Sequence, residues 1–183
     1  FALMPFSPGP GPGAHCIPIA PFYLTWKARE YGQPTRFIEL AGEINTRMPE
    51  IVIHRLGDAL NDQGKPFKGS RVLVLGLAYK ANVDDDRESP SYVLMELLRQ
   101  HGAEVAYHDP YVPVIKMTRE HPQWAGTRSV DWNEAVIRSF DCVLIATAHA
   151  CVDYRQLAAW ARLIADTRNV MSGLATPAPV VKC

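Results

Sequence analysis

The sequence predicts an α/β protein in which a helical region precedes a doubly wound parallel sheet. Short apolar runs alternate with helical patterns after residue 70, which is typical of parallel strands joined by helices. Residues 21–62 instead repeat their apolar side chains near a period of 3.6 residues, which is typical of helices that bury one face. The 183 residues, 48% hydrophobic and 21% charged, suffice for one domain with an arm.

The first 20 residues are rich in proline and glycine, and we expect a rigid loop there. Five prolines lie within them, and a proline inside a helix costs about 3 kcal/mol. The glycines permit close approach of a ligand to the backbone. The segment 1–20 is therefore predicted to expose its backbone groups rather than to form a helix.

The helical pattern of residues 21–62 falls into two parts. Gly32 is a stop signal, and a second pattern begins after Pro34 and Thr35. Its broad apolar face continues to Leu60, although Pro49 is expected to kink or divide the helix.

The remaining residues predict the sheet and its connecting helices. Residues 71–76 form a continuous apolar run, typical of a strand buried on both faces. Ser89 is a candidate N-cap, with Pro90 at the first helical position of a helix that ends near Gly102. The other predicted elements are a strand at 104–108, a short helix at 132–138, a strand at 141–147, a helix after Asp153 and a strand at 163–166.

Charge and composition exclude several classes of protein. There are 19 basic and 19 acidic side chains, so no basic excess would drive binding to nucleic acid or to anionic lipid. No apolar run approaches the roughly 20 residues that span a bilayer, and Phe1–Phe6 lacks the basic start of a secretory signal. Because the chain opens without a methionine, we expect it to begin in mid-motif. We expect neither nucleic acid nor a membrane as a partner.

The four cysteines are far apart in the sequence and include no C-x-x-C pair. This spacing predicts free thiols in a reducing compartment, hence a cytoplasmic protein, and no metal site. Cys142 and Cys151 are interpreted as structural or incidental. Cys16 follows the glycine-rich loop, where a thiol could be reached, although most single cysteines are inert.

The ends of the predicted strands carry the candidate binding groups. Ligands of doubly wound sheets bind at the carboxyl ends of strands. Lys80 follows the first strand and Arg168 the fourth, and two such cations could hold a diphosphate. The alternative is that both are solvated surface charges. Gly76 stands alone rather than in a G-x-G-x-x-G motif, so this half is not an ordinary dinucleotide site.

Three ordered motifs closely resemble the UDP-glucose/GDP-mannose dehydrogenase family: Pro8–Pro21, Gly76–Lys80 and Asp84–Ser91. The continuation Phe22–Lys27 is most similar to the bacterial UDP-N-acetylglucosamine 6-dehydrogenases of surface-polysaccharide synthesis, and the resemblance covers essentially the whole chain, including Tyr107–Tyr111. It implies a catalytic-cysteine loop at 1–20, a central helical dimerisation region at 21–66, and a Rossmann-like UDP-sugar-binding domain at 67–183. The family's N-terminal NAD-binding domain is absent from this sequence.

The resemblance also implies a reaction and its residues. The C6 alcohol of a UDP-sugar, expected to be UDP-N-acetylglucosamine, would be oxidised twice by NAD to the uronic acid through a thiohemiacetal and a thioester at Cys16. Arg87 would contact NAD, and the chain would form a homodimer or a larger oligomer. The residues implied for substrate binding are Ser7, Gly9, Gly11, Gly13, Tyr79, Lys80 and Arg168.

Two positions depart from the family pattern. Ala14 stands where the pattern usually has a glycine, and Ala20 stands where an aspartate assists thioester hydrolysis. The departures leave two hypotheses. Either this is the C-terminal portion of a nucleotide-sugar dehydrogenase, inactive by itself, or it is a non-catalytic UDP-sugar-binding or dimerisation module derived from that family.

Overall fold

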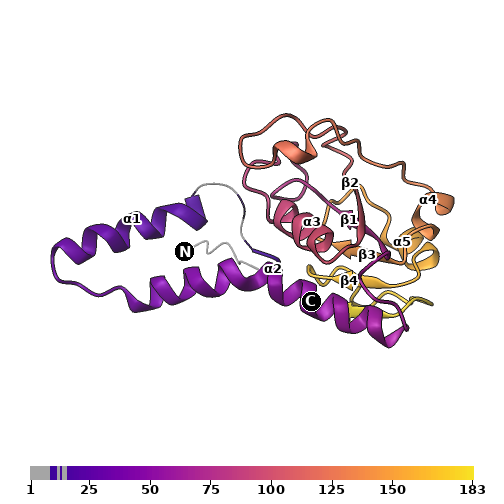
Figure 1. Cartoon of the computed structure of the whole chain (residues 1–183), viewed down its shortest axis with the longest axis horizontal. Helices are drawn as coiled ribbons and strands as arrows, with labels where there is room; N and C mark the ends of the chain where they lie inside the picture. Colours follow the sequence, from indigo (N-terminus) through magenta and orange to yellow (C-terminus); the bar gives the residue numbers. More distant parts are fainter. Residues whose placement is uncertain (1–8, 12, 14–15) are drawn as a thin grey trace.

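The computed structural model describes residues 9–11, 13 and 16–183. Its parts are a helical hairpin and a parallel sheet with helices on both faces (Figure 1). None of the described helices is long and apolar enough to cross a lipid bilayer. The elements are α1 (Cys16–Glu30), α2 (Arg36–Asp62), β1 (Arg71–Leu75), α3 (Pro90–Gln100), β2 (Glu104–His108), the 3₁₀ helix η1 (Pro122–Trp124), α4 (Glu134–Arg138), β3 (Cys142–Ile145), α5 (Tyr154–Trp160), β4 (Ile164–Asp166) and β5 (Val180–Lys182).

The sheet has the strand order β2-β1-β3-β4-β5, and every neighbouring pair is parallel. This confirms the predicted α/β class with a doubly wound parallel sheet. The order reverses between β1 and β3, where the ligand crevice of such folds lies. The sequence analysis did not include β5 or η1, because three residues carry too little pattern to indicate an element.

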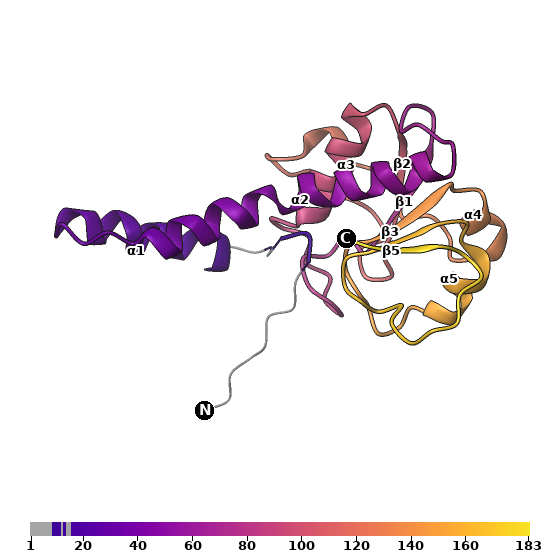
Figure 2. The same ribbon diagram turned by 90° about the horizontal axis from the view of Figure 1, so that it is seen from below.

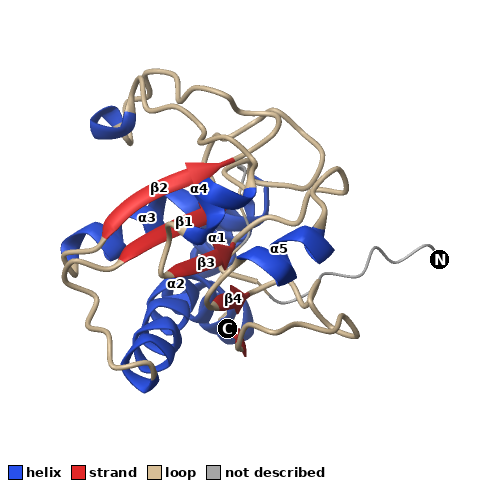
Figure 3. Cartoon of the chain, turned by 90° about the vertical axis from the view of Figure 1, so that its right-hand side faces the viewer, coloured by secondary structure: helices blue, strands red, loops and turns tan. Residues whose placement is uncertain are grey.

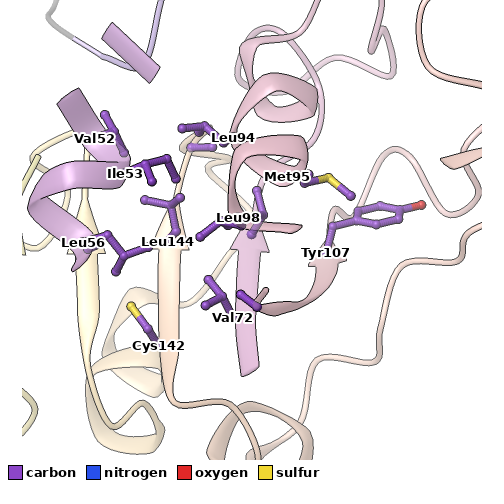
Figure 4. Packing of buried hydrophobic residues seen from close by; sticks show 14 of the residues in the cluster. Val52, Ile53, Leu56, Val72, Leu94, Met95, Leu98, Tyr107, Cys142 and Leu144 are labelled. Carbon is purple, nitrogen blue, oxygen red and sulfur yellow. The ribbon is translucent and has the colours of Figure 1, made fainter. Parts of the chain in front are cut away.

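Alternate side chains of the strands pack against different helices. Val72 and Val74 of β1 belong to a core with α2 and α3, whereas Leu73 and Leu75 belong to a second core with α4 and α5. Figure 3 shows the strands between these two layers. In Figure 4, Leu56 of α2 lies with Leu144 of β3 and Cys142, while Met95 of α3 lies beside Tyr107 of β2.

Helices α1 and α2 form a hairpin that extends away from the sheet (Figures 1 and 2). Phe22 packs on Gly42, where an added Cβ would lie 2.5 Å from the ring atom Cζ. Arg29 pairs with Glu39 at 2.9 Å across the turn. The second half of α2 then joins the core of the sheet through side chains such as Val52.

Of two expectations about proline, one was wrong and the other was wrong in part. Helix α1 begins at Cys16, inside the segment 1–20 that was expected to be a loop. Pro18 lies in its first turn, where the missing N–H would have no helical partner, and Pro21 removes only one bond. Pro49 was expected to kink or divide α2, and the structure excludes only the division, because the helix runs unbroken to Asp62. The short helix α4 also begins at Glu134, two residues later than predicted.

Candidate functional site

The candidate site lies at the carboxyl ends of β1, β3 and β4. Tyr79 and Lys80 follow β1, His149 follows β3, and Arg168 follows β4. The backbone turns sharply at Gly76, where φ is +90° and an added Cβ would lie 2.4 Å from the Thr147 carbonyl oxygen. Glycine at this position therefore lets the ends of β1 and β3 approach each other closely.

The described part of the glycine-rich loop packs against these strand ends. A Cβ added to Gly9 would lie 2.3 Å from Nη1 of Arg168, and one added to Gly13 would lie 2.5 Å from the Cβ of Tyr79. Gly11 approaches the Asn45 carbonyl, which has no helical donor because Pro49 lacks an N–H. The structure thus brings Gly9, Gly13, Tyr79 and Arg168 together from distant parts of the sequence.

Arg168 is held by hydrogen bonds to residues at the carboxyl ends of β3 and β4. Its Nε donates a 2.8 Å hydrogen bond to the Ala146 carbonyl, and its backbone N–H donates to Oδ1 of Asp166 at 2.8 Å. The side chain is half-buried, and burial lowers the pKa of its guanidinium group. Because an arginine with this partial burial stays protonated, it presents a fixed cation beside Gly9.

Lys80 and Tyr79 occupy the loop that follows β1. Lys80 is exposed and Tyr79 is half-buried. The Tyr79 backbone N–H donates to the Asp85 carbonyl at 3.0 Å, which folds the loop back on itself. The Lys80 ammonium group is exposed to water, whereas the Arg168 guanidinium is held by its hydrogen bond to the Ala146 carbonyl.

Arg87 lies farther along the same loop. Its Nε and Nη2 donate to the two oxygens of Asp85 at 2.9 and 2.7 Å, and this hydrogen bonding and charge raise the pKa of the guanidinium. Arg87, which was expected to contact NAD, thus forms an ion pair with Asp85 in this structure. Gly76 follows β1 without the further glycines of a dinucleotide motif, so the turn after β1 is not an ordinary dinucleotide site.

Cys16 and Ser7 are described less fully. Cys16 begins α1, although the placement of its side chain is not described, and Ser7 lies outside the described residues. Ala14 also lies outside them. Ala20, which replaces the aspartate of the family pattern, is an exposed residue of α1. Across the described residues no cluster of three metal-ligating side chains is found.

A buried Asp109–His149 pair adjoins the site, and the sequence analysis assigned it no role. The side chains are fully buried, with Nε2 of His149 3.0 Å from Oδ2 of Asp109. Burial alone would raise the pKa of Asp109, but hydrogen bonds from His149 and from the backbone N–H groups of Ala78 and Tyr111 outweigh it and lower the pKa. The Asp-Pro dipeptide directly after a strand marks Asp109 in the sequence, but it gives no sign of the partner His149.

A separate cavity of about 420 Å³ lies away from the strand ends. It is lined by residues of α2 and α3 and by the segment before β1, including His54, Asp58, Phe67 and His101. Since residues 65–67 precede β1, the cavity adjoins the amino end of that strand.

Known proteins are similar to this chain over most of its length. The UDP-binding-domain model of the UDP-glucose/GDP-mannose dehydrogenase family matches residues 73–173, and the central-domain model matches residues 2–47. A UDP-N-acetyl-D-mannosamine dehydrogenase of Pyrococcus horikoshii is 34% identical over 171 residues, covering 90% of this chain and 37% of that protein. A UDP-N-acetyl-D-glucosamine 6-dehydrogenase of Salmonella typhi is 29% identical over 147 residues, covering 80% of this chain and 33% of that protein.

The fold similarity is equally extensive. The solved structure of the UDP-D-ManNAc dehydrogenase from Pyrococcus horikoshii matches with a TM-score of 0.80 at 28% identity, covering 99% of this chain and 40% of that one. The chain spans about a third of the length of these curated relatives. The UDP-binding-domain model alone matches more than half of the residues. The chain therefore belongs to the UDP-glucose/GDP-mannose dehydrogenase family and carries the family's central and UDP-binding domains.

Proposed function

We propose that this chain binds a UDP-sugar and is the cysteine-bearing portion of an NAD-dependent nucleotide-sugar 6-dehydrogenase. The observation that supports this most is the packing of Gly9 and Gly13 on Arg168 and Tyr79 at the carboxyl ends of the strands. A pyrophosphate laid there would meet a cation and exposed backbone, both of which bind phosphate oxygens. The names of the relatives favour an N-acetylhexosamine as the sugar, in the gluco or the manno configuration.

In the proposed reaction, Cys16 captures the aldehyde formed from the C6 alcohol. Its thiolate sulfur bonds to C6 while the carbonyl electron pair moves to oxygen and takes a proton, giving a thiohemiacetal. Loss of hydride from C6 and of the hydroxyl proton gives a thioester. Water then adds, the C–S bond breaks, and the carboxylate leaves with the thiol restored.

NAD is the acceptor of both hydrides in this family, and among the described residues the turn after β1 lacks a dinucleotide glycine motif. We therefore assign the chain three tasks: holding the UDP moiety, covalent capture at Cys16, and subunit contact. Backbone N–H groups at a helix N-terminus stabilise a thiolate, and Cys16 begins α1.

The alternative is a non-catalytic UDP-sugar-binding or dimerisation module. Ala20 in place of the family's aspartate favours it, because thioester hydrolysis would lack its assisting carboxylate. The two proposals share UDP binding and differ in whether a form of the protein supplied with an NAD-binding domain releases NADH.

UDP binding is tested by calorimetry on the 183-residue chain. We expect UDP and UDP-N-acetylglucosamine to bind, and NAD to bind weakly or not at all. A charge-assisted hydrogen bond contributes about 1.5–3 kcal/mol, so Lys80→Ala should weaken UDP about tenfold or more. Lys116→Ala, which removes another exposed lysine, is the control and should leave the affinity unchanged. Tighter binding of NAD than of UDP would refute the assignment.

We also propose that the chain forms a homodimer through residues 35–62, which contain α2 of the helical hairpin. Phe37, Leu40 and Ile44 lie on one side of α2 and are 88%, 50% and 52% exposed. Exposed apolar residues that follow a helical stripe mark interaction sites.

Sedimentation analysis should therefore find a dimer at micromolar concentration. Leu40→Glu should give a monomer, because it places a charge inside the apolar contact. Arg155→Glu, a charge change on the exposed side of α5, should leave the dimer intact. A wild-type chain that sediments only as a monomer would contradict this proposal.

A further inference from the structure

Four polar side chains beside the candidate site connect the ends of three strands. Asp109 accepts five hydrogen bonds and so links β2 to the loop after β1. Its Oδ2 accepts from the backbone N–H groups of Leu77 and Ala78 at 2.6 and 2.9 Å. Its Oδ1 accepts from Tyr111 and Val112 at 2.8 and 3.0 Å, and His149 is the fifth donor.

The hydrogen bonds also fix the proton on His149. The backbone N–H of Asn82 donates to Nδ1 of His149 at 3.0 Å, so Nδ1 must be an acceptor. The proton of the neutral ring therefore resides on Nε2, which donates to Asp109. In return, Oδ1 of Asn82 accepts from the backbone N–H of Ala150 at 2.8 Å.

The fourth member is Thr147, whose buried hydroxyl donates to the Ala78 carbonyl at 2.7 Å. Ala78 and Asn82 are thus both attached to the end of β3, and Tyr79 and Lys80 lie between them. Asn82 adopts a φ of +63°, which its side-chain bond to Ala150 helps to hold. The backbone that carries Tyr79 and Lys80 is therefore anchored at both ends.

We propose that Asn82, Asp109, Thr147 and His149 are positioning residues that hold Tyr79 and Lys80 in the geometry that binds the diphosphate. This inference rests on the proposed UDP site. A loop ordered before binding loses less entropy when the ligand arrives, so preorganisation appears as affinity. None of the four residues needs to touch the ligand for this effect.

The test uses two neutral substitutions in the 183-residue chain. Asn82→Gly removes the amide bond to Ala150, and glycine tolerates the left-handed backbone. Thr147→Val removes the hydroxyl with little change in shape, and Thr147→Ser is the matched variant that restores it. Two quantities are measured well below the unfolding temperature: UDP affinity by calorimetry, and amide hydrogen exchange of residues 77–82 without ligand.

We expect Asn82→Gly and Thr147→Val each to weaken UDP about 3–10-fold and to speed exchange at residues 77–82, and Thr147→Ser to restore both. An unchanged affinity overturns the inference, as does a loss of affinity without faster local exchange. A wild-type chain that does not bind UDP overturns the proposed function instead, and the exchange data alone then decide whether these residues hold the segment.

Discussion

Asp109→Ala is expected to lower the free energy of unfolding by about 3–5 kcal/mol. The carboxylate is buried and serves five donors, which come from the loop after β1, its own turn after β2, and His149 after β3. Removing it leaves backbone N–H groups buried without an acceptor, and each such group costs about 1–3 kcal/mol. The structure at three strand ends therefore depends on this one side chain.

Urea unfolding followed by circular dichroism measures the loss. Asp131→Ala is the matched control, because Asp131 is exposed, and it should change the free energy of unfolding by less than about 0.5 kcal/mol. Equal effects of the two substitutions would show that the buried hydrogen bonds do not support the fold.

The pH dependence of the free energy of unfolding is a second test of the contribution of Asp109 to stability. Its pKa is lower in the folded protein than the ordinary 3.8, so its contribution is full above about pH 4. That contribution is lost as the pH falls through the lowered pKa, because the unfolded chain takes up the proton first. We expect stability to fall more steeply below pH 4 in the wild type than in Asp109→Asn; parallel curves would contradict this.

The second large effect concerns Cys16, which we expect to be the most reactive thiol of the chain. We also expect the 183-residue chain to release no NADH. The dinucleotide glycine motif is missing from the turn after β1, and Ala20 stands where the family pattern has the assisting aspartate. Each missing acid–base partner is worth about 10²–10⁴-fold in rate, so turnover should not exceed background.

The competing thiols differ from one another in burial. Burial in β3 raises the pKa of Cys142 well above its usual range, and partial burial raises that of Cys183 to about 11. Cys183 is held at the end of the chain, because its backbone N–H donates to the Asp166 carbonyl and its side chain packs on the core. The exposed Cys151 is therefore the thiol that competes most with Cys16.

Timed alkylation with mass-spectrometric mapping tests this order in a Cys151→Ser background. Cys16 should be labelled first and Cys142 last, while an assay with UDP-N-acetylglucosamine and NAD stays at background. Labelling of Cys142 before Cys16, or steady NADH formation, would show that the assignment of Cys16 or of the missing groups is wrong.

Local signals in the sequence were sufficient for most of the sheet domain. Ser89 caps α3 as predicted, with its side chain accepting from the Ser91 N–H, and the apolar run at 71–76 contains β1. The rule for strand ends also pointed to Lys80 and Arg168, which follow the carboxyl ends of β1 and β4. Their contact with UDP stays a prediction.

The features that were missed depend on contacts between distant residues. Asp109 and His149 are 40 residues apart, and nothing local to either shows that their strands end side by side. The start of α1 was wrong because the cost of a proline depends on its position within the helical turn, which a count of prolines ignores. The alternative that Pro49 divides α2 was wrong for a related reason, since tertiary packing sustains the helix through one lost hydrogen bond.

The most direct test of the central claim is an NMR titration of the isotopically labelled chain with UDP. If UDP binds at the strand ends, the largest amide shifts should fall on Gly9, Gly13, Tyr79, Lys80 and Arg168, with His54 and His101 of the α2–α3 cavity unaffected. Shifts confined to that cavity, or no shifts at saturating UDP, would contradict the account.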